Sequence, residues 1–157
     1  MFKKGEIQGV LIRPLVKYKD KRGWLIELFR QDELEQDYLP VMSYISMTEA
    51  GVARGPHEHV AQTDLFGFLG PSNFKLYLWD NRKNSPTYMH KQIVVVGEEH
   101  PAAVLVPPGI VHAYKNIGPV LGMVTNYPNQ LFAGKGRKNP VDEIRHENDP
   151  NTIFKLD

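Results

Sequence analysis

The 157-residue sequence contains no cysteine, which excludes disulfide bonds and thiolate chemistry. No apolar run reaches the roughly 18–20 residues that span a bilayer, and none follows Lys3 and Lys4 as a signal peptide would require. A strong excess of one charge is also lacking: the formal net charge is +1 without a long basic run, which argues against a nucleic-acid partner. We therefore expect a single cytoplasmic domain over residues 1–157, with no membrane contact.

Short β-branched and aromatic runs, separated by Gly, Pro and Asn turns, dominate the chain as far as Asn126. One short helix is expected over 31–37, and Leu39-Pro40 ends it. This pattern predicts an all-β sandwich or barrel, and a double-sheet jelly roll suits ligand-lining histidines on facing strands. The predicted strands are 10–15, 24–29, 42–48, 63–70, 74–80, 91–96, 102–106 and 120–126.

From Pro128 onward the composition becomes polar, and we expect residues 128–157 to form an extension that packs on the barrel. Residues 133–140 are rich in glycine and basic side chains. Such a segment is either a solvated surface loop or a cover that contacts an anionic ligand.

Two segments, 51–59 and 107–116, carry the residues with the most chemistry. In extended strands the period of 2 puts His57 and His59 on one face, and likewise His112 and Tyr114. The spacing of His57, His59 and Asp64 after Gly51, and of His112 after Pro107 and Gly109, resembles the two cupin motifs. In metal-binding cupins these positions are the ligands, so this resemblance implies a site made of His57, His59, Asp64 and His112. Three imidazoles and a carboxylate suit Fe, Mn, Ni or Zn.

A narrower resemblance covers most of the chain. Five segments, in order and at similar spacing, resemble the dTDP-4-dehydrorhamnose 3,5-epimerases: 20–27, 54–57, 80–87, 108–112 and 125–127. The resemblance implies a cupin-type double-stranded β-helix (jelly roll) with short peripheral helices, and an isomerase that needs no cofactor. Its implied substrate is a dTDP-linked or other NDP-linked 4-keto hexose, used to make sugars for cell-surface polysaccharides. It also implies a homodimer, for which the apolar run 24–29 is a suitable edge.

Epimerisation next to a ketone needs a base on one face of the carbon, donors to the enolate oxygen and an acid on the other face. The family resemblance makes His57 the base, and it places Arg54 and His112 beside the enolate. Arg22 and Glu27 would reach the nucleotide, often across a dimer interface, although Glu27 also fits a solvent-facing position on an edge strand. In full, the implied catalytic residues are His57, His112 and Tyr127, and the implied substrate-binding residues are Arg22, Glu27, Arg54, His59, Asp64 and Tyr114.

The sequence departs from the family pattern in three places. Relatives carry a lysine near Asp64, and they carry a tyrosine acid where this chain has Gly122-Met123. Tyr127 and Tyr114 are the candidates to replace that acid. The carboxylate that orients the base comes late in relatives, where Asp149 and Asp157 are the candidates. A one-centre epimerase, a ketoisomerase, a metal-dependent cupin enzyme and a non-catalytic sugar-nucleotide binding protein therefore remain alternatives.

Overall fold

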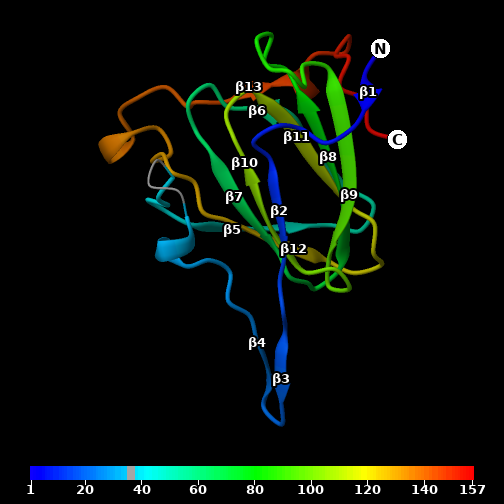
Figure 1. Cartoon of the computed structure of the whole chain (residues 1–157), viewed down its shortest axis with the longest axis vertical. Coiled ribbons are helices and arrows are strands. Elements are labelled where there is room, and N and C mark those ends of the chain that lie inside the picture. Colours follow the sequence, from blue (N-terminus) through cyan, green and yellow to red (C-terminus); the bar gives the residue numbers. More distant parts are fainter. Residues whose placement is uncertain (35–37) are drawn as a thin grey trace.

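The computed structural model describes residues 1–34 and 38–157, and its dominant feature is a pair of facing β-sheets (Figure 1). One sheet has the order β1 (Lys3–Lys4), β9 (His90–Gly97), β8 (Asn73–Asp80), β11 (Ile110–Asn116), β6 (Ala53–Glu58) and β13 (Ile144–Arg145). The other has the order β2 (Leu11–Pro14), β10 (Ala102–Val106), β7 (Asp64–Phe68), β12 (Gly122–Asn126) and β5 (Tyr44–Thr48). Strands β5 to β12 contribute four members to each sheet, which confirms the expected all-β cupin-type jelly roll.

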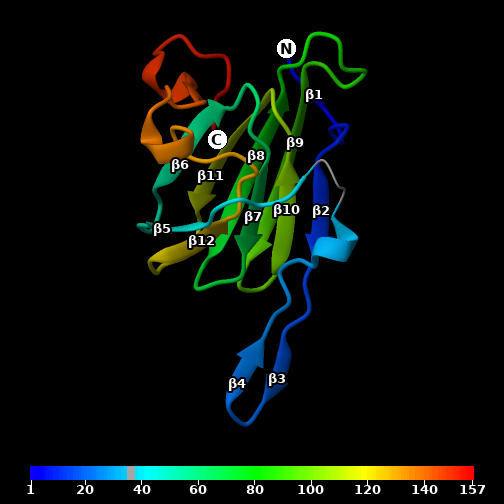
Figure 2. The same cartoon turned by 90° about the vertical axis from the view of Figure 1, so that its left-hand side faces the viewer.

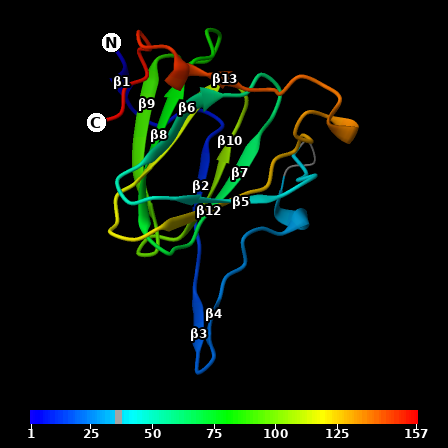
Figure 3. The same cartoon turned by 180° about the vertical axis from the view of Figure 1, so that it is seen from behind.

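The core follows from the alternation of side chains along these strands. On β8, Phe74, Leu76 and Leu78 point between the sheets and are fully buried, while Tyr77 and Trp79 point to the outer face. That outer face is covered by both ends of the chain, which lie close together in Figure 3. The inner cluster is completed by aromatic and aliphatic residues of the other strands, among them Phe66, Phe68, Val104, Val106, Ile110, Tyr114 and Val124.

Residues beyond Pro128 lie against the barrel in two places. Strand β13 pairs with β6, with Ile144 opposite Glu58, and Phe154 packs edge-on against Trp79 with ring centroids 5.8 Å apart. A short 3-10 turn, η2 (Lys135–Arg137), precedes β13, and a second, η3 (His146–Asn148), lies between β13 and Phe154. No helix within the described residues is long and apolar enough to cross a membrane.

A hairpin of β3 (Tyr18–Asp20) and β4 (Gly23–Leu25) projects from one end of the barrel (Figure 2). Its tip is the predicted turn at Asp20-Lys21-Arg22-Gly23. The expected strand 24–29 is wrong beyond Leu25, because Phe29 instead packs on Tyr127 at the outer face of the second sheet. The helix expected over 31–37 is a 3-10 turn, η1 (Gln31–Glu33), and residues 35–37 lie outside the described residues.

Asp80, at the end of β8, anchors the loop that follows it. Its buried carboxylate accepts hydrogen bonds from Arg82 through the backbone N (3.0 Å), Nε (2.9 Å) and Nη2 (2.8 Å). The hydroxyls of Ser85 and Thr87 donate to the same carboxylate, each at 2.6 Å. Burial raises the pKa of Asp80, but these donors outweigh it and hold the pKa well below its usual range. This part of the epimerase-like pattern thus has a structural explanation.

Candidate active site

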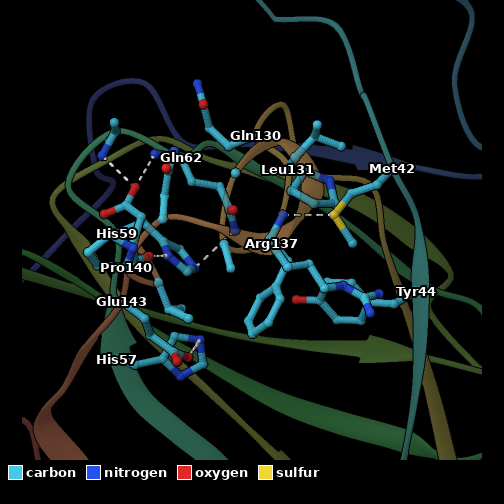
Figure 4. A pocket seen from close by; sticks show the side chains of 18 of the residues that line it. Met42, Tyr44, His57, His59, Gln62, Gln130, Leu131, Arg137, Pro140 and Glu143 are labelled. Carbon is cyan, nitrogen blue, oxygen red and sulfur yellow. Dashed lines mark hydrogen bonds and ion pairs between the residues drawn. The ribbon is translucent and has the colours of Figure 1, made fainter.

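A cavity of about 520 Å³ opens between β5, β6 and the segment 128–145 (Figure 4). Its volume lies within the range of small-molecule sites, which is roughly 300–1,000 Å³. Polar side chains from separate parts of the sequence line it, including Tyr44, His57, His59, Arg137, Glu143 and Arg145. Of the two alternatives for the glycine-rich loop, the structure favours the cover, because residues of this loop line the cavity.

A β-bulge brings the histidines together. Between β6 and β11 the register shifts, so that His57 faces His112 while Arg54 faces Tyr114. Gly55 sits in this irregularity with φ of +82°, and a Cβ there would lie 2.5 Å from the carbonyl oxygen of His112. Only glycine fits such a position. As a result the ring centroids of His57 and His112 lie 4.4 Å apart.

His59 completes the cluster. His57, His59 and His112 each present a ring nitrogen within 4.8 Å of the others. Nδ1 of His59 contacts the carbonyl of Asp142, and Nδ1 of His112 lies 3.1 Å from the carbonyl of Ile110. A carbonyl only accepts, so both Nδ1 atoms carry hydrogen and both Nε2 atoms face the interior of the cluster.

Asp64 lies directly beneath these rings and is almost completely buried. Its Oδ1 accepts hydrogen bonds from Nε2 of Gln62 (2.9 Å) and Nδ2 of Asn126 (2.8 Å). Its Oδ2 lies 3.1 Å from Nε2 of His59 and 3.5 Å from Nε2 of His112, but without hydrogen-bond geometry. Oδ2 of Asp64, Nε2 of His112 and Oδ1 of Asn126 are the buried side-chain polar atoms without a partner in the described part of the chain. Such atoms cost about 1–3 kcal/mol each, so their concentration at one place points to a functional site.

The charges of these groups are coupled. Burial raises the pKa of Asp64, but the imidazoles of His59 and His112 outweigh it and lower that pKa. Burial opposes a charge on His59, yet the Asp64 carboxylate raises its pKa to about 8. Burial lowers the pKa of His112. Burial and the two neighbouring imidazoles also lower the pKa of His57, so its imidazole is neutral at neutral pH.

A carboxylate stands behind His57. Oε1 of Glu143 lies 3.7 Å from Nε2 of His57, and Figure 4 shows the two side chains next to each other at the cavity. The neighbouring Asp142 fixes this arrangement, because its carboxylate accepts the backbone N–H groups of residues 60, 61 and 62, each at 2.8 Å. The segment that carries Glu143 is thereby tied to the loop that follows His59.

The residues beneath the cavity also fit a metal ion. Three imidazoles and the carboxylate of Asp64 are donors that Zn²⁺ or Fe²⁺ accepts, and two of the unpartnered atoms, on Asp64 and His112, face each other there. The carbonyls at Nδ1 of His59 and His112 orient the rings as outer partners of a metal site do. A bound divalent ion would supply positive charge that polarises a substrate carbonyl.

The structure brings together four of the nine predicted site residues: His57, His59, His112 and Asp64. Arg54 does not line the cavity, since its guanidinium donates to Thr48 and to the carbonyl of Met47. The other four also lie outside the cavity, and their roles stay predictions: Tyr114 in the core, Tyr127 on the outer face, and Arg22 and Glu27 on and beside the hairpin.

The expected orienting carboxylates do not reach His57. Asp157 pairs with Lys75 at 2.7 Å, and Asp149 caps a turn by accepting from the backbone of Asn151. Glu143 occupies the position instead. The sequence does not single out Glu143, because only the fold of residues 128–145, which ends in the pairing of β13 with β6, brings its side chain to the cavity. Tyr44 also lines the cavity and carries no sequence signal of its own, because it is one residue within the predicted strand 42–48.

Comparison with known proteins matches this arrangement. The sequence model of the family described as dTDP-4-dehydrorhamnose 3,5-epimerase matches residues 4–130. The "Probable low-salt glycan biosynthesis epimerase Agl13" of Haloferax volcanii is 35% identical over 127 residues, which cover 80% of this chain and 81% of that protein. The "Spore coat polysaccharide biosynthesis protein SpsL" of Bacillus subtilis is 33% identical over 112 residues, covering 71% and 73%.

Solved structures show the same fold. A dTDP sugar isomerase from Desulfovibrio desulfuricans G20 superposes with a TM-score of 0.80 at 18% identity, over 96% of this chain and 91% of that one. The Legionella pneumophila epimerase RmlC, in complex with dTDP-4-keto-L-rhamnose, gives a TM-score of 0.77 at 21% identity, over 98% and 82%. The chain belongs to the dTDP-4-dehydrorhamnose 3,5-epimerase family and is an isomerase of the epimerase type.

Proposed function

We propose that the protein inverts a carbon next to the 4-keto group of a dTDP-linked or other NDP-linked hexose, with His57 as the base. The observation that carries this proposal is the position of His57, which lines the cavity with Oε1 of Glu143 3.7 Å from its Nε2. The names of the two relatives support a role in making surface glycans.

The chemistry follows from these positions. A proton next to a ketone is acidic because the carbanion delocalises into an enolate, so a neutral imidazole near neutral pH can remove it. The imidazolium that forms on His57 is stabilised by the nearby carboxylate of Glu143. His59, whose pKa is raised to about 8, keeps its proton near neutral pH and supplies positive character within the same cluster. Nε2 of the neutral His112 carries no hydrogen to donate, so the donor role implied for His112 stays a prediction.

Arg137 supports binding of the nucleotide part. It lines the cavity and comes from the glycine-rich loop that covers it, whereas the guanidinium of Arg145 is paired with Glu143, with Nη2 2.7 Å from Oε2. Guanidinium groups bind phosphate oxygens with two parallel hydrogen bonds, which suits the diphosphate of a nucleotide sugar. We therefore assign binding of the diphosphate to this loop.

A homodimer is part of the proposal. The projecting hairpin exposes Tyr18 (63%), Trp24 (49%) and Leu25 (65%), an apolar surface that a second copy could cover. In such a dimer Arg22 and Glu27 would act at the partner's cavity. Light scattering of the wild type against Trp24→Glu tests this, since the variant should become monomeric. The nucleotide-sugar substrate also supports a cytoplasmic location, which cell fractionation would test.

The function is tested by incubating the purified protein with a dTDP-linked 4-keto-6-deoxyhexose in D₂O. NMR should show deuterium entering at C3 or C5 and an inverted product. An absence of exchange, with a related epimerase active in the same solution, would overturn the proposal. Tight nucleotide binding without exchange would instead identify a sugar-nucleotide binding protein.

The second candidate is a metal-dependent enzyme that uses His57, His59, Asp64 and His112. The unpartnered atoms of Asp64 and His112 favour it. Elemental analysis of protein purified without chelator separates the two candidates. One bound metal per chain would support this reading, and failure to bind Zn²⁺, Fe²⁺, Mn²⁺ or Ni²⁺ would exclude it.

A further inference from the structure

The family pattern has a tyrosine acid where this chain has Gly122-Met123. The structure shows why position 122 has no room for a tyrosine side chain. A Cβ at Gly122 would lie 2.4 Å from Cζ of Phe74 and 3.0 Å from Nδ2 of Asn116. The ring of Phe74 is fully buried in the core and cannot easily move aside. An acid for the second face of the substrate must therefore come from another strand.

The chain has seven tyrosines, all of them in described positions. The two sequence-based candidates are otherwise engaged. The hydroxyl of Tyr114 pairs with Oγ of Ser46 at 2.8 Å in the core, and the ring of Tyr127 packs on Phe29 outside the barrel. Tyr38 and Tyr77 use their hydroxyls on backbone carbonyls, and Tyr18 and Tyr88 are exposed elsewhere. Tyr44 is the tyrosine that lines the cavity.

The hydrogen bonds around Tyr44 leave its own proton available. Nδ2 of Asn126 donates to the Tyr44 hydroxyl at 2.7 Å and to Oδ1 of Asp64 at 2.8 Å. The carboxylate only accepts, so the amide must present its NH₂ group to both partners. The Tyr44 oxygen is consequently an acceptor towards Asn126, and its O–H hydrogen is not used by a described protein group. Desolvation and the charge of Asp64 raise the pKa of Tyr44, which keeps the phenol protonated.

Tyr44 and His57 come from different sides of the cavity, on β5 and β6, and in Figure 4 the Tyr44 ring extends inward from the side away from His57. Inversion needs a proton removed from one face of the carbon and another delivered to the opposite face. We propose that Tyr44 is the catalytic acid, an inference that rests on the epimerase function proposed above.

Inversion by this pair of residues conserves protons and electrons. His57 takes the proton of the C–H bond next to the ketone, and that bond's electrons enter the enolate. The enolate carbon then forms a new C–H bond with the Tyr44 proton on the other face. An imidazolium and a phenolate remain, and they return to neutral forms by exchanging one proton through solvent. No oxidant or cofactor is needed.

The test separates proton exchange from inversion. Tyr44→Phe and wild type are incubated in D₂O with a dTDP-linked 4-keto-6-deoxyhexose, and NMR follows deuterium content and configuration. His57 can still remove and return a proton on its own face, so exchange with retained configuration should stay within about threefold of wild type. Net inversion should fall by about 10²–10⁴-fold.

Tyr88→Phe is the matched control, because it removes an exposed phenol outside the cavity, and it should invert at the wild-type rate. Inversion by Tyr44→Phe at the wild-type rate would overturn the assignment. A second result would also overturn it: a Tyr44→Phe protein that keeps the wild-type melting temperature and dTDP affinity but loses exchange and inversion equally. That result would indicate that Tyr44 positions the sugar and does not donate the proton. A wild-type protein that exchanges no deuterium would overturn the epimerase function itself, and this inference with it.

Discussion

Two buried aspartates show how differently one fold treats the same side chain. Asp80 accepts five hydrogen bonds, from Arg82, Ser85 and Thr87, and both of its oxygens are satisfied. Asp64 has one satisfied oxygen and one that faces the imidazoles of His59 and His112 without a hydrogen bond. Asp80 lies in a segment that resembles the epimerase family and Asp64 in one that resembles the first cupin motif, so resemblance alone does not separate structure from chemistry.

The difference identifies which region can act on a ligand. A saturated carboxylate has no lone pair left to offer and serves to hold a loop in place. An unsaturated buried group costs stability unless a proton, metal or substrate completes it. We therefore assign stability to the loop around Asp80 and chemistry to the cavity above Asp64.

The largest effect is expected at the cavity. His57→Asn should lower deuterium exchange and epimerisation by about 10³-fold or more, because it removes the base, and the melting temperature should change little. NMR in D₂O and thermal denaturation measure both. His100→Asn, at an exposed histidine, is the matched control. An active His57→Asn enzyme would contradict the assignment of the base.

The reverse pattern is expected at Asp80. Asp80→Asn turns one acceptor oxygen into a donor and breaks the buried network, which should cost about 2–4 kcal/mol of stability. In a chain of this size that lowers the melting temperature by roughly 2–4 °C per kcal/mol. The specific activity of folded protein at low temperature should persist. Glu99→Gln, at the surface, should leave the melting temperature unchanged. Loss of activity in a stable Asp80→Asn protein would show that this region takes part in the chemistry.

Replacement of Glu143 tests how much kcat depends on the negative charge beside His57. Glu143→Gln keeps the shape but removes the carboxylate 3.7 Å from His57. Losing about 1.4 kcal/mol of imidazolium stabilisation corresponds to a tenfold lower kcat. Steady-state kinetics measure it, with Glu147→Gln as the control on the same segment. An unchanged kcat for Glu143→Gln would remove Glu143 from the mechanism.

The smallest effect is expected at the cover of the cavity. Arg137→Ala should raise KM about five- to tenfold with little change in kcat, because it weakens binding of the diphosphate and leaves the base in place. Lys138→Ala, the neighbouring basic residue outside the cavity, should keep the wild-type KM. Equal KM values for the two variants would contradict the role of Arg137.

The sequence predicted the barrel well because period-2 alternation and turn residues mark most strands directly. It failed at 24–29, where Leu28 and Phe29 are apolar because they pack on the outside of the second sheet: a Cβ at Gly67 would meet Leu28 at 2.7 Å. The spacing of the cupin motifs identifies four site residues from the sequence: His57, His59, Asp64 and His112. Glu143 and Tyr44 were not found, since their approach to the cavity depends on tertiary structure.

The central claim is that His57 acts as a base and not as a metal ligand. The most direct measurement is deuterium incorporation into a dTDP-linked 4-keto-6-deoxyhexose by protein freed of metal with a chelator, compared with the same protein after addition of Zn²⁺, Fe²⁺, Mn²⁺ or Ni²⁺. We predict full exchange in the chelated protein, and no gain or an inhibition after addition, because a metal held by the three imidazoles would occupy the base. Exchange that is absent in the chelated protein and restored by metal would contradict this account.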